Sequence, residues 1–67
     1  MMFISIEKDN LIYESEYYIE ENQVVVIGNR GQEAIDINGM KVEQAAKAGL
    51  RNLIRKKLID PIDKSPK

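Results

Sequence analysis

Residues 11–27 read LIYESEYYIEENQVVVI, and this stretch decides the fold. Between Leu11 and Ile19 the odd-numbered positions are mostly apolar, whereas the even-numbered positions include Glu14 and Glu16. An alternation with a period of two is typical of a β-strand that is covered on one face only. Residues 23–27 contain a short, contiguous β-branched run, which predicts a central strand that is apolar on both faces.

Turn residues separate these two strands from each other and from their neighbours. Residues 20–22 lie between the two strands, and residues 8–10 precede the first of them. Asp and Asn favour turns because their side chains bond their own backbone. An earlier alternating segment, residues 2–7, predicts another strand, and residues 33–37 predict a fourth after the Gly-containing loop 28–31. Connections this short permit only hairpins, so the strands should form an antiparallel meander.

The pair Asn38-Gly39 leaves the number of strands open. It suits a type I′ hairpin turn, with residues 40–42 as a fifth short strand. It suits equally a junction that leads directly into a helix. The sheet is therefore expected to have four or five strands.

Residues 42–58 predict one amphipathic α-helix. They are rich in strong helix formers, and their apolar side chains fall on one broad stripe. Gly49 lies on the edge of that stripe, which predicts a close approach to the sheet. Pro61 disfavours the α conformation at Asp60, so Pro61 is expected to end the helix. The expected fold is α+β, an antiparallel four- to five-stranded meander with this C-terminal helix packed on one face.

The expected core combines inward-facing strand residues with the apolar stripe of the helix. It comprises Ile4, Ile6, Leu11, Tyr13, Tyr17, Val24, Val26, Ile35, Ile37, Val42, Ala46, Leu50 and Leu53.

The chain has 67 residues, which suits one domain over residues 1–58 and a polar, Pro-containing tail over residues 59–67. A core of this size rarely supplies more than about 3–5 kcal/mol, and small domains usually carry a disulfide, a metal or a partner subunit. The chain has no Cys and no His, which removes disulfides and the usual zinc ligands. A well-idealised core or self-association remains, and we expect self-association because the apolar fraction of 43% is ordinary; no metal and no cofactor are expected.

The charge is distributed very unevenly. Residues 1–39 have a net charge of −6 and residues 40–67 have a net charge of +5, although the whole chain is at −1. Such asymmetry indicates an interaction surface. No apolar run is long enough to cross a membrane, and the N-terminus turns charged too early for a signal peptide. We therefore expect a cytoplasmic protein that makes no membrane contact.

Catalysis is not expected. The chain lacks His, Cys and Thr, which removes the commonest general base and the commonest reactive thiol. The remaining serines, Ser5, Ser15 and Ser65, stand in no nucleophile motif. The loop 28–31 does not match the phosphate-binding loop pattern, and its glycines are better explained by a turn. No catalytic or metal-binding residues are therefore assigned.

Two surfaces remain as candidates for binding. The first is an acidic and aromatic strand together with one edge of the helix, which suits contact with another protein or a second copy. Its candidate residues are Tyr13, Glu14, Glu16, Tyr17, Tyr18, Ile54 and Leu58. The second is a basic ridge on the helix, which suits contact with nucleic-acid phosphates. Its candidate residues are Lys47, Arg51, Arg55 and Lys56.

A protein-interaction or regulatory module that self-associates is the function we expect first. Its small size and lack of catalytic residues suit an accessory protein of a phage or mobile element. Nucleic-acid binding through the basic ridge comes second, because a sequence pI near 5.3 is low for a nucleic-acid-binding domain.

Overall fold

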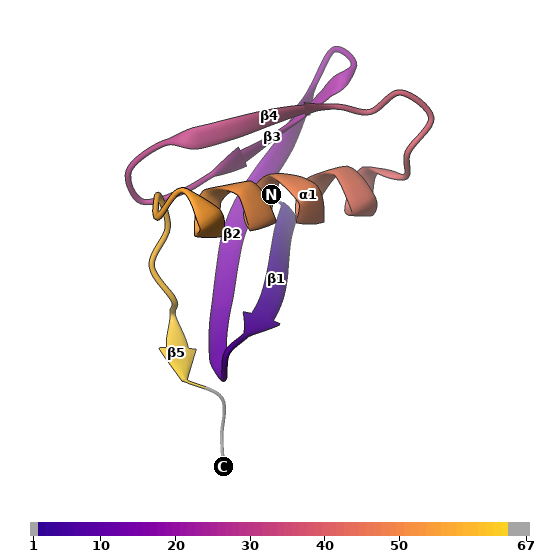
Figure 1. Cartoon of the computed structure of the whole chain (residues 1–67). Coiled ribbons are helices and arrows are strands. Elements are labelled where there is room, and N and C mark those ends of the chain that lie inside the picture. The colour runs from indigo at the N-terminus through magenta and orange to yellow at the C-terminus, as the bar shows by residue number, and fades with distance from the viewer. Residues whose placement is uncertain (1, 65–67) are drawn as a thin grey trace.

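The computed structural model describes residues 2–64, which form one antiparallel sheet and one helix packed on it (Figure 1). The elements are β1 (Met2–Lys8), β2 (Leu11–Glu20), β3 (Gln23–Ile27), β4 (Gln32–Asp36), α1 (Val42–Arg55) and β5 (Asp63–Lys64). The strand order is β1-β2-β3-β4, and the two-residue β5 pairs with β2. The expected α+β meander with one C-terminal helix is confirmed.

Strand β2 joins two hairpins that use different parts of its length. Strand β1 pairs with Leu11 to Tyr17, whereas β3 pairs with Tyr17 to Glu20. Tyr17 is therefore the one position of β2 that pairs with both β1 and β3. The β3–β4 hairpin crosses the β1–β2 hairpin at a steep angle, and α1 lies across the inner side of this bend (Figure 1).

The turn at Asn38-Gly39 leads into the helix and not into a fifth strand. Both residues have positive φ, at 42° and 82°, as a type I′ turn requires, and the Met40 amide donates to the Ile37 carbonyl. Residues 40 and 41 then lead directly to Val42, where α1 begins. The alternative of a strand at residues 40–42 is therefore wrong.

The helix is shorter than expected, ending at Arg55 and not near Leu58. Its last turn closes as a Schellman motif. Lys57 adopts a positive φ of 61°, its amide donates to the Ile54 carbonyl, and the Leu58 amide donates to the Leu53 carbonyl. The left-handed conformation of Lys57 ends the helix, so Pro61 is not needed to stop it.

The core lies between α1 and the inner face of the sheet. Its fully enclosed side chains include Val24, Val26, Leu50 and Leu53. Ala45 and Ile59 are buried members that the sequence pattern did not predict, whereas Leu11 is only half-buried and lies outside the cluster. The other expected members belong to the core or pack against it.

The tail expected over residues 59–67 is docked on the domain as far as the structure describes it. Ile59 enters the core, the Ile62 amide donates to the Ile12 carbonyl, and β5 extends the sheet beside β2. The packed part of the chain therefore extends beyond residue 58, the predicted boundary between the domain and the tail. Residues 65–67, which include Ser65, lie outside the described part of the chain.

Candidate functional site

The outer face of the sheet, which points away from α1, carries an apolar patch among carboxylates. Val24 and Val26 pack toward the helix, so alternation turns Val25 outward, where it pairs with Tyr18 and Ala34. Phe3, Tyr18 and Ile27 are 57%, 40% and 38% exposed on this side. We call these three residues the outer patch.

Carboxylates lie between and beside the residues of the outer patch, and the outward positions of β1–β4 hold no Lys or Arg. Glu16 pairs with Phe3 in register and lies two residues from Tyr18, and Glu14 follows on the same face. Glu20 and Asp36 lie at the end near the β2–β3 turn. Lys8, the one cation in these strands, occupies an inward position of β1. The face is therefore acidic with an apolar centre.

The residues predicted for a protein interface divide between the two faces. Glu14, Glu16 and Tyr18 lie on the outer face. Tyr13 and Tyr17 lie on the inner face, half-buried against the core. The side chains alternate along one strand, so the five residues cannot form one surface.

The predicted helix edge does not form an exposed patch. Ile54 and Leu58 are both half-buried and packed against the core. Leu58 lies beneath the β3–β4 loop, where a Cβ added at Gly31 would be 3.0 Å from its Cδ1. Sequence periodicity did not identify Phe3 and Ile27 as candidate interface residues. The pattern that could have identified them was an apolar residue at an outward-facing position of a strand.

The basic ridge predicted for nucleic-acid contact is partly neutralised. Lys56 forms an ion pair with Glu33 at 2.8 Å, and Lys47 lies 3.8 Å from Glu43. Arg55 donates a hydrogen bond to Asn52 Oδ1 at 2.8 Å. Two of the four candidate cations thus already face a carboxylate, which lowers the charge that the ridge offers to phosphates.

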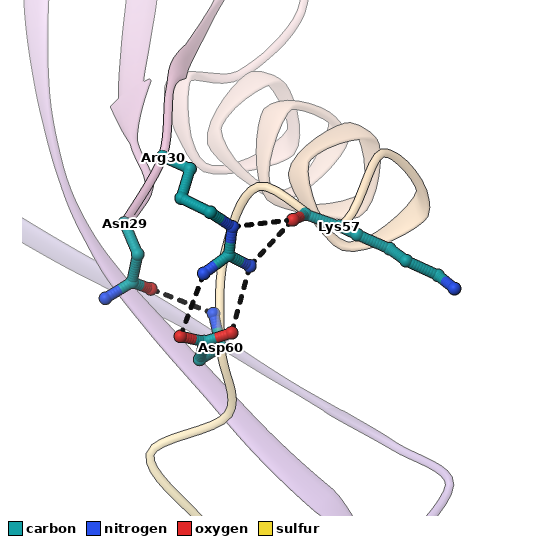
Figure 2. A network of polar contacts seen from close by, with 4 residues as sticks. All are labelled: Asn29, Arg30, Lys57 and Asp60. Atoms are coloured by element: carbon teal, nitrogen blue, oxygen red, sulfur yellow. Dashed lines mark hydrogen bonds and ion pairs between the residues drawn. The ribbon is translucent and has the colours of Figure 1, made fainter.

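The loop between β3 and β4 is bonded to the segment that follows the helix (Figure 2). Arg30 forms a bidentate pair with Asp60 at 2.9 and 3.0 Å, and donates to the Lys57 carbonyl through Nη2 at 2.7 Å and Nε at 3.1 Å. Asn29 Oδ1 accepts from the Asp60 amide at 2.8 Å. The Gly28 amide donates to the Gly31 carbonyl within the loop. These donors are used internally, so the loop acts as a latch and not as an anion cradle.

Acid is expected to weaken this latch. The hydrogen bonds from Arg30 lower the pKa of Asp60 below its ordinary value near 3.8, and charge attraction adds to them against desolvation. A carboxylate whose pKa is lower in the folded state stabilises the fold above its unfolded pKa and loses that effect as pH falls. Urea unfolding midpoints should therefore drop between pH 5 and pH 2.5 by more in the wild type than in Asp60→Asn.

The matched control for this prediction is Glu20→Gln, which removes an exposed carboxylate from the outer face. It should keep the full acid dependence of the wild type. Equal acid sensitivity in Asp60→Asn and the wild type would show that the latch does not contribute.

One further position, Ser15, bears on chemistry. Ser15 is 5% exposed on the inner face, and its hydroxyl has no hydrogen-bond partner in the described structure. Residues 2–64 contain no group of three or more acidic side chains arranged to hold a metal ion. Within the same range, no helix has the length and apolarity to span a bilayer.

Comparison with protein-family models, with curated protein sequences and with solved structures finds no match to this chain. The described surfaces are therefore the basis for any functional proposal.

Proposed function

We propose that this chain is a small non-catalytic module that binds a basic protein surface through the outer face of its sheet. The observation that supports this proposal is the outer patch, Phe3, Tyr18 and Ile27, exposed among carboxylates where the outward positions of β1–β4 hold no Lys or Arg. Contiguous exposed apolar side chains with a polar rim are typical of interaction sites, and aromatic residues are enriched in them.

Charge selects the partner. A surface with Lys or Arg around an apolar centre would complement Glu14, Glu16 and Glu20, which favours fast association and excludes acidic competitors. Two copies stacked through this same face would bring both sets of carboxylates together, which disfavours a symmetric dimer of that kind. A second copy could bind only by offering another surface, such as the basic side of α1.

The test is a titration of the ¹⁵N-labelled chain with a synthetic peptide of alternating Leu and Lys, monitored by amide chemical shifts. The chemical-shift changes should concentrate in β1, β2 and β3. The affinity for the peptide should fall as the salt concentration rises. The same peptide with Glu in place of Lys should not bind. Phe3→Ser with Tyr18→Ser should weaken binding by about tenfold or more, since aromatic anchors contribute most of such energies.

Glu43→Gln is the matched control, because it removes a carboxylate from the helix and leaves the outer face intact. It should bind the Lys peptide as the wild type does, whereas Glu14→Gln with Glu16→Gln should bind more weakly. Unmoved amide signals at millimolar peptide, or shifts confined to α1, would contradict the proposal. Sedimentation of the free chain at rising concentration tells whether a second copy can be the partner.

A further inference from the structure

A groove of about 580 Å³ lies between the C-terminal part of β1 and the second half of α1. Apolar side chains, Ile6 and Ile54, line it together with the cations Lys8, Arg51 and Arg55. Its volume falls within the range of small-molecule sites, about 300–1,000 Å³. It lies on the helix side of the molecule, away from the outer patch.

The cations of the groove come from two elements that the fold brings together. Lys8 occupies an inward position at the end of β1, two residues after Ile6. Arg51 and Arg55 are four residues apart on α1, a spacing that places their side chains next to each other. Glu7 also lines the groove, so these four charged groups sum to +2.

Arginine pairs of this kind are suited to phosphate. The guanidinium group has five N–H donors in a planar fork, and it binds phosphate oxygens in bidentate fashion. Arg55 uses Nη2 on Asn52 Oδ1, which orients the group and leaves other donors for a ligand. A phosphate monoester carries about −1.5 to −2 at neutral pH, which matches the net charge of the groove.

We propose that this groove binds a small, water-soluble phosphate monoester with an aliphatic arm. The phosphate lies between Arg51 and Arg55 with Lys8 nearby, and the arm lies along Ile6 and Ile54. The charge supplies attraction and the apolar lining distinguishes such an ester from inorganic phosphate. This proposal does not depend on the outer patch.

The test compares three probes by amide chemical shifts of the ¹⁵N-labelled chain: hexyl phosphate, inorganic phosphate and hexanol. Hexyl phosphate should shift the signals of Ile6, Lys8, Arg51 and Arg55 and bind about tenfold or more tightly than either other probe. Equal binding of hexyl and inorganic phosphate would overturn the proposal, because the apolar lining would then have no part in recognition.

Variants locate the site. Arg51→Gln with Arg55→Gln should lower the affinity for hexyl phosphate by about tenfold or more. Lys47→Gln is the matched control, because Lys47 lies one turn earlier on α1, outside the groove and beside Glu43, and it should leave the affinity unchanged. Circular dichroism verifies that each variant is folded. Unchanged affinity in the arginine variant would overturn the proposal.

Two more probes separate other sources of phosphate. Short DNA is the first of these probes. If it binds more tightly than hexyl phosphate, and if the same arginine variant loses this binding, the groove would be assigned to a nucleic-acid backbone and the proposal overturned. The chain should not co-sediment with phosphatidylcholine vesicles that contain phosphatidic acid. Co-sedimentation would assign the groove to a lipid headgroup instead.

Discussion

Leu50→Ala is expected to leave most of the chain unfolded at 25 °C. Leu50 is fully enclosed between α1 and the sheet. Truncating a buried Leu costs about 2–5 kcal/mol, from lost burial and from the cavity left behind. A single core in a chain this short rarely supplies more than about 3–5 kcal/mol in total. Far-ultraviolet circular dichroism and urea titration measure the result.

The control for Leu50→Ala is Ile62→Ala, because Ile62 is a large apolar residue that stays 58% exposed. Surface substitutions usually change stability by no more than about 0.5 kcal/mol. A cooperative transition in Leu50→Ala within about 1 kcal/mol of the wild type would contradict the packing described for the helix. Addition of a bound partner could mask the effect, so the free chain is the sample to use.

Gly49→Ala is expected to destabilise the protein, although the same change would stabilise an isolated helix by about 1 kcal/mol. A Cβ on Gly49 would lie 2.6 Å from Val26 Cγ2 and 3.2 Å from its Cβ. Val26 is fully buried and β-branched, so it has no other rotamer to adopt freely. Overpacking of this kind costs typically about 1–3 kcal/mol. Comparison of the urea unfolding midpoints of the wild type and Gly49→Ala shows whether the substitution destabilises or stabilises the protein.

A double variant separates this close contact from a general effect of helix substitution. Gly49→Ala with Val26→Ala should be more stable than the sum of the two single changes predicts, because the truncated side chain makes room for the new methyl group. Ala48→Gly, on the neighbouring position, should simply lose about 1 kcal/mol of helix propensity. An increase in stability for Gly49→Ala alone would show that the helix does not approach the sheet so closely.

Strand identity was readable from the sequence because β2 is covered on one face and the central strand β3 is buried on both. The alternation over residues 11–19 predicted β2, and the β-branched run predicted the central strand β3, buried at Val24, Val25 and Val26. The turns of two to four residues between consecutive strands left no alternative to hairpins. Gly49 was also identified in advance, since a glycine on the apolar stripe of a helix needs a packing reason.

The boundaries at the C-terminal end of the chain were not readable in this way. Arg30 bonds the Lys57 carbonyl and Asp60, which are 27 and 30 residues away in sequence. That contact fixes the segment that follows α1, which packs on the domain through Ile59. The helix itself ends earlier than expected, at Arg55. Local propensity carries no information about a partner from a distant loop.

The candidate interface shows the same limit. The sequence marked the acidic, tyrosine-containing strand but could not say that Phe3 and Ile27 join Tyr18 on one face, because cross-strand register decides which strands supply the neighbours. The sequence marked Arg51 and Arg55 as candidate phosphate contacts but not the groove that they line, since Lys8 and Arg51 are 43 positions apart in sequence and line one groove only when β1 lies beside the helix.

By itself, the sequence determined the four main strands and the helix, their antiparallel order, the amphipathic faces and the separation of charge between the two halves. These follow from periodicity, turn chemistry and composition, which act over a few residues at a time. Tertiary structure alone decided the bend at Tyr17, the latch at Arg30, the outer patch and the groove. Each of these depends on side chains from separate elements meeting in space, and burial and long-range pairing are settled only when the whole chain packs.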